Sequence, residues 1–400
     1  MAKILCVLYD DPVEGYPPEY IRKEIPELKE YPDGQKLPTP KNIDFTPGEL
    51  LGCVSGELGL RKFLEKEGHS LIVTNDKDGP DSVFEKELPD ADVVISQPFW
   101  PAYLTRERIH KAKKLKLAIT AGIGSDHVNL DAAMEKGITV AEVTWCNSVS
   151  VAEHSVMMIL SLVRNYIPSY NWVINKGWNI ADCVQRSYDL EGMTVGIVAS
   201  GRIGLGVIKR LAAFDVKIHY TDRHRLSIEQ EQEYGLTFHS DLESLIKISD
   251  IISLHCPLHK ETEHMINEGT IALMKPGAYI VNTARGKLCD RDAVVRALES
   301  GKLGGYAGDV WFPQPPSEKH PWRTMPFHGM TPHTSGTSLA AQARYAAGVR
   351  EILECWLDKK PIREEYLIVD KGDLAGTGAR SYSAGDSTSG SEEAVGFRKV

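Results

Sequence analysis

The chain lacks the features that mark a secreted, membrane-bound or metal-binding protein. Its 400 residues include only seven cysteines, and no two of them have the Cys-x-x-Cys spacing of a zinc or redox site. No apolar stretch approaches the roughly 18–20 residues that a membrane span needs. The apolar run near Met1 is too short for a signal-peptide core. These absences predict a cytoplasmic protein with reduced thiols, no metal site and no membrane partner.

An excess of positive charge is also missing. The formal net charge is -9, and residues of both signs are mixed along the sequence. Nucleic acids and anionic membranes need a basic face on their protein partner, so neither is expected here. An anionic substrate would have to be attracted by local cations rather than by the global field.

Strand patterns alternate with helix patterns along most of the chain, and 400 residues suit two domains. We predict an α/β protein with two Rossmann-like domains, in which a dinucleotide-binding domain (148–335) is inserted into a discontinuous, flavodoxin-like substrate domain (1–147 and 336–400). The predicted strands are Ile4–Asp10, Leu71–Asn75, Val93–Gln97, Leu117–Ala121 and Ile138–Val143 in the first domain, and Thr194–Val198, Val216–Thr221, Ile251–Leu254, Ala278–Asn282 and Tyr306–Val310 in the second.

Several helices and two irregular segments complete this outline. Apolar periodicity predicts helices over Glu57–Glu67, Thr105–Lys114 and Ser150–Asn165, and the last of these suits either a subunit interface or an internal crossover. Ser240 to Glu243 fits a capping box, and Asp290 can cap the helix that Gly301 ends. The proline-rich segment from Pro12 to Pro47 is a linker or a packed arm with Tyr16, Tyr20, Tyr31 and Phe45. Residues 371–400 are a Gly/Ser-rich tail.

A dinucleotide fingerprint follows the strand Thr194–Val198. The turn runs Ala199-Ser200-Gly201-Arg202-Ile203-Gly204 into a helix, whose N-terminus can bind a pyrophosphate. Ala199 replaces the usual first glycine, which we expect to be tolerated if its φ is negative. Asp222, 21 residues beyond Gly201, can accept hydrogen bonds from ribose hydroxyls and repel a 2′-phosphate, although Arg223 partly offsets that repulsion. The predicted cofactor is therefore NAD.

Polar residues follow the carboxyl ends of the later strands, where ligands of open α/β sheets bind. These are Cys256-Pro257, Thr283, Arg285, Asp309 and His333. Arg285 is placed to hold a carboxylate with two hydrogen bonds, and Asp309 to fix the nicotinamide carboxamide. His333 is either a buried core histidine or a cleft residue. Cys256 is either a thiol sensitive to oxidation near the cofactor or an inert buried one.

The stretch from Met274 to Gly286, continuing to Gly308-Asp309-Val310, resembles the signature of the D-2-hydroxyacid dehydrogenase superfamily. Within it, Ser96 to Pro101, Thr120 to His127, Cys146-Asn147-Ser148, Gln314-Pro315 and Pro332 to Gly336 look most like the NAD-dependent formate dehydrogenases, and the resemblance covers essentially the whole chain. It implies oxidation of formate to CO₂ with hydride transfer to NAD⁺, and a homodimer. The residues that it implies around formate are Ile123, Asn147, Arg285 and His333, with Pro98 and Phe99 shaping the pocket. The implied nicotinamide contacts are Asp309, Ser335 and Gly336.

Gln314 is the most informative residue chemically. Hydroxyacid enzymes of the superfamily pair their histidine with a Glu, which raises the pKa of the histidine so that it can exchange the alcohol proton. Formate oxidation moves a hydride and has no proton to abstract. A neutral Gln amide beside His333 orients the ring without holding a proton on it, which fits a hydride-only reaction.

Two other functions remain open on the sequence alone. One is a D-2-hydroxyacid dehydrogenase for a larger substrate, and the missing Glu and the bulky Pro98-Phe99-Trp100 stretch speak against it. The other is an NAD-sensing binding protein, which would leave Arg285 and His333 without a reaction. NADH formation with formate, glycerate or lactate separates all three.

Overall fold

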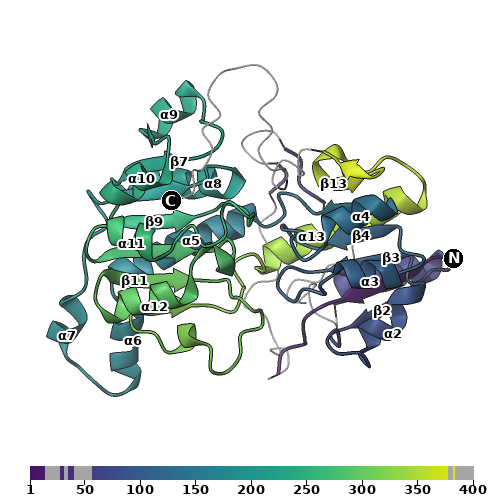
Figure 1. Ribbon diagram of the computed structural model, residues 1–400, viewed down its shortest axis with the longest axis horizontal. Helices are drawn as coiled ribbons and strands as arrows, with labels where there is room; N and C mark the ends of the chain where they lie inside the picture. Colours follow the sequence, from purple (N-terminus) through teal and green to yellow (C-terminus); the bar gives the residue numbers. More distant parts are fainter. Residues whose placement is uncertain (14–27, 31–34, 40–55, 377–381, 383–400) are drawn as a thin grey trace. The chain divides into compact units, whose positions relative to one another are not determined.

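The computed structural model describes residues 1–13, 28–30, 35–39, 56–376 and 382 (Figure 1). Most of the proline-rich segment, including Tyr16, Tyr20, Tyr31 and Phe45, and most of the tail lie outside the described residues. By its internal contacts the chain divides into two compact units. Unit 1 is Met1–Asn147 with Gly336–Ser383, and unit 2 contains Ser148–Ser335.

Unit 1 is built on a sheet that has seven strands within the described residues. Its order is β14-β13-β5-β4-β3-β1-β2. β1 to β5 are parallel in the order 2-1-3-4-5 of flavodoxin-like folds, and β13 pairs antiparallel with β5. The strands are β1 Lys3–Val7, β2 Ser70–Thr74, β3 Val93–Ser96, β4 Leu117–Thr120, β5 Thr139–Glu142, β13 Leu367–Asp370 and β14 Asp373–Leu374.

Helices cover both faces of this sheet, because its short apolar strands are buried on both sides. One core contains Leu64 of α1 (Arg61–Lys66) and Tyr345 of α13 (Leu339–Leu357). The opposite core contains Phe84 of α2 (Val83–Glu87), Ile109 of α3 (Arg106–Lys111) and Ala132 of α4 (Leu130–Lys136). Consecutive residues of β1 alternate between the two cores, as the period of two requires.

Unit 2 is a parallel sheet with seven strands among its described residues, in the order β12-β11-β10-β9-β6-β7-β8. Numbered within the unit, the first six strands have the order 6-5-4-1-2-3, which is that of a Rossmann domain. The strands are β6 Thr194–Val198, β7 Lys217–Thr221, β8 Thr237–Phe238, β9 Ile251–Leu254, β10 Ala278–Asn282, β11 Leu303–Gly308 and β12 His328–Met330. The predicted fold class is confirmed.

Two groups of helices enclose the unit-2 sheet. α5 (Ser148–Val163) and α8 (Arg202–Leu211) share one core with β6 and β7. α10 (Leu242–Ile248), α11 (Glu268–Leu273) and α12 (Arg291–Glu299) share the other. α5 buries most of its apolar residues inside unit 2, as an internal crossover does, whereas Met157 is 48% exposed. The remaining helices are α6 Tyr166–Ile174, α7 Ile180–Val184 and α9 Ile228–Tyr234.

Local differences from the sequence predictions have physical causes. The capping box at Ser240 is wrong, because Asp241 is the N-cap and accepts a hydrogen bond from Ser244 N at 2.8 Å. The cap at Asp290 is confirmed, since its carboxylate accepts from Ala293 N at 2.9 Å. The helix expected over Glu57–Glu67 is a short 3₁₀ turn followed by α1. None of the described helices is both long and apolar enough to span a bilayer.

Candidate active site

The turn after β6 is tighter than the sequence suggested. Ala199 has φ +73°, so the condition under which we expected an alanine to be tolerated is not met. The helix packs directly on this turn, because a Cβ on Gly204 would lie 2.1 Å from the Ala199 carbonyl oxygen. This close approach imposes on an alanine the left-handed conformation that glycine normally takes.

The same turn leaves space where a dinucleotide would bind. A Cβ on Gly201, the N-cap of α8, would meet nothing within 4 Å, and no side chain caps this ten-residue helix. Arg202 and Ile203 form its first turn. These features fit a pyrophosphate at the helix N-terminus.

Asp222 is attached to this turn by hydrogen bonds. It follows β7, and its Oδ2 accepts from Ser200 N at 2.6 Å and from Ser200 Oγ at 3.2 Å. Its Oδ1 accepts from His224 N at 2.9 Å. The carboxylate is therefore held beside the phosphate-binding turn, where a ribose would lie, and Arg223 follows it directly.

The turn containing Arg285 is held by a buried asparagine at the end of β10. Asn282 Nδ2 donates to the Arg285 carbonyl at 2.9 Å, and its Oδ1 accepts from Ala284 N at 3.1 Å. A Cβ on Gly286 would lie 2.6 Å from the carbonyl carbon of Trp311, so this turn packs against the loop that leads to Gln314. The half-buried Arg285 donates from Nη1 to the Ala284 carbonyl at 2.7 Å.

His333 has a strained backbone and two fixed neighbours. Its φ is +59°, which is rare for a residue other than glycine and typical of functional sites. Its Nδ1 lies 2.8 Å from Gln314 Oε1. The buried Asp309 carboxylate accepts from Thr334 N and Ser335 N, both at 2.8 Å, and so fixes the backbone that follows His333.

These residues meet at one edge of one sheet. Asn282 of β10 pairs with Gly308 of β11, and Gly308 pairs with Met330 of β12. The turns with Arg285, Asp309 and His333 therefore leave the carboxyl ends of three adjacent strands. Within unit 2, Arg285, Asp309 and His333 therefore follow neighbouring strands at the same edge of the sheet.

Two residues of α5 contribute contacts that the sequence analysis missed. His154 Nε2 lies 3.2 Å from Thr331 Oγ1, which in turn donates to Asp309. Ser155 Oγ lies 2.8 Å from Thr283 Oγ1. Burial lowers the pKa of His154, which favours its neutral form. The available signal was the polar run Glu153-His154-Ser155 in the middle of a largely apolar helix.

Cys256 and Pro257 follow β9. Burial raises the pKa of the Cys256 thiol to about 12, so it is protonated at neutral pH, and its Sγ lies 3.5 Å from Met265 Sδ. The Pro257 carbonyl accepts from Thr262 Oγ1 at 2.8 Å. The cysteines of the described residues are free.

The predicted site residues that lie in unit 1 are Pro98, Phe99, Ile123, Asn147 and Gly336. A Cβ on Gly336 would lie 2.5 Å from Asn147 Nδ2 and 3.2 Å from Phe99 Cε1, and a Cβ on Gly122 would lie 2.9 Å from Pro98 Cδ. Ile123 is half-buried against the same core as Phe99. Asn147 is buried, and its Oδ1 has no hydrogen-bond partner among the described residues. A buried amide with one end unpaired is suited to a polar ligand.

Gln97 is a second such amide that the sequence analysis did not single out. It is fully buried beside Pro98, and neither end of its side chain has a hydrogen-bond partner in the described part of the chain.

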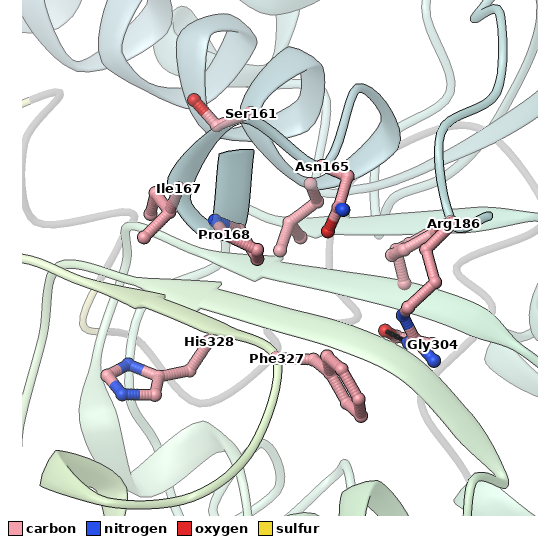
Figure 2. Close-up of a pocket in the computed structure, with 10 residues that line it drawn as sticks. Ser161, Asn165, Ile167, Pro168, Arg186, Gly304, Phe327 and His328 are labelled. Carbon is pink, nitrogen blue, oxygen red and sulfur yellow. Dashed lines mark hydrogen bonds between the residues drawn. The ribbon is translucent and has the colours of Figure 1, made fainter. Parts of the chain in front are cut away.

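Two surface hollows of unit 2 lie away from the predicted site residues. Figure 2 shows one of them, where Ile167 and Pro168 of α6 face Arg186 and Phe327. The other, of about 730 Å³, lies at the amino-terminal edge of the sheet, opposite to the predicted site, and is lined by Asp250 and Lys275 among others. Neither contains a predicted site residue.

Comparison with known proteins supports the same chemistry. Residues 156–335 match the model of the D-isomer specific 2-hydroxyacid dehydrogenase NAD binding domain. The chain is 70% identical over 400 residues, covering all of both chains, to the formate dehydrogenase of Pseudomonas sp. (strain 101).

Two solved structures extend this likeness to the fold. A formate dehydrogenase from Granulicella m. is 67% identical with a TM-score of 0.92, over 94% of this chain and 100% of that one. A NAD-dependent formate dehydrogenase from Staphylococcus aureus, solved in complex with NAD, is 41% identical with a TM-score of 0.77, over 92% of this chain and 99% of that one.

Proposed function

The chain belongs to the formate dehydrogenase family. From this premise we propose which of its residues bind and orient formate while it is oxidised to CO₂ and NAD⁺ is reduced to NADH. The observation that carries the proposal is the grouping of Arg285, Gln314 and His333 at the carboxyl edge of the unit-2 sheet. A guanidinium suits a carboxylate, and a Gln–His pair offers polar contacts without a strong base.

Four side chains hold the substrate in this proposal. Arg285 binds the formate oxygens with two hydrogen bonds, and the Asn147 amide, whose free end is buried, holds one of them. His333 contacts formate with the ring edge that faces away from Gln314. Pro98, Phe99 and Ile123 form the apolar wall, which excludes water and limits the substrate to one carbon.

The reaction needs orientation and electrostatics rather than acid–base catalysis. The C–H bond of formate breaks with its electron pair, and NAD⁺, when bound, accepts that hydride at its nicotinamide. No proton leaves the substrate, so a residue that removes one is not required. The protein contributes by aligning the C–H bond and fixing the departing CO₂.

The cofactor contacts are proposed within unit 2 and at Gly336. The N-terminus of α8, with Ser200 to Gly204, binds the pyrophosphate, and Asp222 accepts from the ribose hydroxyls. Arg223, Cys256, Pro257 and Thr283 line the adenosine and ribose side, and Asp309, His333, Ser335 and Gly336 contact the nicotinamide. Asp222→Gln should loosen the preference for NAD⁺ over NADP⁺, and an unchanged preference would contradict the ribose contact.

The test of the proposed site is NADH formation by the Arg285→Ala variant. We expect kcat/KM for formate to fall by about 10²–10³-fold, because a charged bidentate contact is lost. Arg291→Ala is the control, since Arg291 is an exposed arginine paired with Asp292. Retained turnover in Arg285→Ala would remove this residue from the carboxylate site. Turnover of glycerate or lactate by the wild type would favour a hydroxyacid dehydrogenase, and NAD binding without turnover a sensor.

We also propose that the protein is a homodimer that associates through the surface of α6 and α7. Aromatic and aliphatic side chains are exposed there, and Trp178 and Ile180 have exposed fractions of 84% and 67%. Contiguous apolar patches of this kind are rare on monomers, and twofold homodimers are the commonest oligomers. The other exposed large apolar residues of this surface are Tyr166, Ile167, Tyr170, Trp172, Val173, Ile174 and Val184.

A cytoplasmic location is proposed as well, because the described cysteines, several of them buried, are all unpaired. Fractionation of the source cells with a cytosolic marker enzyme tests this. Recovery in a membrane or organelle fraction would contradict it.

A further inference from the structure

A buried carboxylate in unit 1 connects the loop of Ile123 to a residue near the end of the chain. Glu142, the last residue of β5, is only 3% exposed. Its Oε2 accepts from Gly124 N at 3.0 Å, from Ser125 Oγ at 3.1 Å and from the Tyr382 hydroxyl at 3.1 Å. Three donors on one oxygen compensate for the loss of hydration of a buried negative charge.

The Tyr382 hydroxyl has two roles in this network. Its oxygen accepts from Ser125 N at 2.6 Å while its proton is donated to Glu142. Removing this hydroxyl would leave the Ser125 N–H without its acceptor and Glu142 Oε2 with two donors instead of three. Such losses are costly, because neither group can return to water without moving the loop.

The loop itself has little intrinsic preference for one conformation. Gly122 and Gly124, on either side of Ile123, have φ of +147° and +109°. Because glycine has no Cβ, its backbone can adopt many conformations. The position of Ile123 therefore depends on the hydrogen bonds made by Gly124 and Ser125. Ser125 is fully buried, and its Oγ also lies 2.9 Å from Thr120 Oγ1 at the end of β4.

We propose that Tyr382 is a positioning residue for formate oxidation, which sets the affinity for formate by holding Ile123 in place through Ser125 and Glu142. This inference rests on the proposed function, because it requires that Ile123 line the formate site. It adds a residue 257 positions away from Ser125 in the sequence to the determinants of substrate binding.

The variant Tyr382→Phe removes only the hydroxyl. Its KM for formate should rise about tenfold, as expected when a hydrogen bond to a charged group is lost. The inhibition constant of azide, a linear anion with the shape of CO₂, should rise in parallel. The KM for NAD⁺ should stay within about twofold of the wild-type value, because the proposed cofactor contacts lie elsewhere.

Tyr366→Phe is the matched control. Tyr366 is buried in unit 1, and its hydroxyl donates to Glu351 at the same distance of 3.1 Å, in a pair that includes neither Ser125 nor Glu142. An equal rise in the KM for formate in both variants, or an equal rise for NAD⁺, would show a general structural effect and overturn the inference.

Hydrogen exchange of the wild type and Tyr382→Phe separates failure of the inference from failure of the proposed site. Exchange in a peptide covering residues 120–126 should accelerate in the variant, since Ser125 N loses its acceptor. If Ile123→Ala changes the KM for formate and Tyr382→Phe does not, the inference is overturned and the proposed site stands. If neither variant changes it although exchange accelerates, the assignment of Ile123 is overturned, and this inference with it.

Discussion

At the scale of single residues, backbone conformation could not be predicted from the sequence. Ala199 and His333 have φ of +73° and +59°, although neither residue type favours a positive φ. Packing of α8 on the turn imposes the first, and the hydrogen bonds that Asp309 accepts from Thr334 N and Ser335 N support the second. Residue types therefore predicted which positions belong to the candidate site. The backbone strain at those positions could not be predicted, because it depends on contacts between segments distant in the sequence.

The strain at Ala199 predicts that Ala199→Gly is stabilising. The left-handed conformation costs a residue with a Cβ about 1–2 kcal/mol, and the added flexibility of glycine in the unfolded chain offsets about 0.5–1 kcal/mol of the gain. We expect the free energy of unfolding in urea to rise by about 0.5–1 kcal/mol. Ala272→Gly, on the exposed side of α11, should lower it by a similar amount. A loss of stability in Ala199→Gly would contradict this account.

Gln314 predicts a change in pH dependence. A Glu at this position would raise the pKa of His333, so the ring would become cationic as the pH falls through that raised value. A cation stabilises the formate anion more than the transition state, from which negative charge departs with the hydride. The kcat of Gln314→Glu should therefore decrease toward low pH, while that of the wild type stays flat. Identical kcat profiles between about pH 6 and pH 9 would exclude this role.

At the scale of elements, three strands of unit 2 were predicted to the residue, whereas the strand with two adjacent glycines was not. The bounds of β6, β9 and β10 agree with the prediction. β11 begins three residues before the predicted strand, because Gly304 and Gly305 belong to it. A Cβ on Gly304 would lie 2.3 Å from the Gly277 carbonyl oxygen, so these glycines allow close packing instead of breaking the strand.

The residue after β9 predicts acid sensitivity of unit 2. Burial lowers the pKa of His255 to about 3, and its Nδ1 has no hydrogen-bond partner among the described residues. The unfolded chain takes up a proton near pH 6.5 and the folded one does not. The free energy of unfolding is therefore unaffected by His255 above about pH 6.5. Below that pH it decreases, by at most about 1.4 kcal/mol per pH unit.

The check is the midpoint of urea unfolding of wild type and His255→Gln between about pH 7.5 and pH 4.5. The variant should lose less stability on acidification, because one buried imidazole no longer has to be kept neutral. His110→Gln, at an exposed histidine, is the control. Equal slopes for the wild type and His255→Gln would assign the acid sensitivity to other groups.

At the scale of the whole molecule, the order of strands and the polar residues at their carboxyl ends were readable from the sequence. That reading predicted the Rossmann and flavodoxin-like sheets and the grouping of Arg285 with His333. Contacts between remote segments were not readable, such as His154 with Thr331 or Tyr382 with Glu142. Neither was the apolar surface of α6 and α7, because the sequence analysis considered only the helix that became α5 for a subunit interface and left an internal crossover open as its alternative.

The exposed apolar surface of α6 and α7 predicts that two chains associate through it. If α6 and α7 form the interface, light scattering should give a mass twice the 44.4 kDa of one chain at micromolar concentration. Trp178→Glu combined with Ile174→Glu should shift the protein to the monomer, since burying two carboxylates in an apolar contact costs several kcal/mol.

Ile228→Glu is the matched control, because Ile228 of α9 is 64% exposed, between Ile174 at 54% and Trp178 at 84%, but lies outside the surface of α6 and α7. This variant should keep the wild-type mass. A monomeric wild type would exclude the dimer, and an unchanged mass in the double variant would move the interface away from α6 and α7. The double variant should also keep its affinity for NAD⁺, because these helices contain none of the proposed cofactor residues, and loss of that binding would indicate misfolding of unit 2 instead of dissociation.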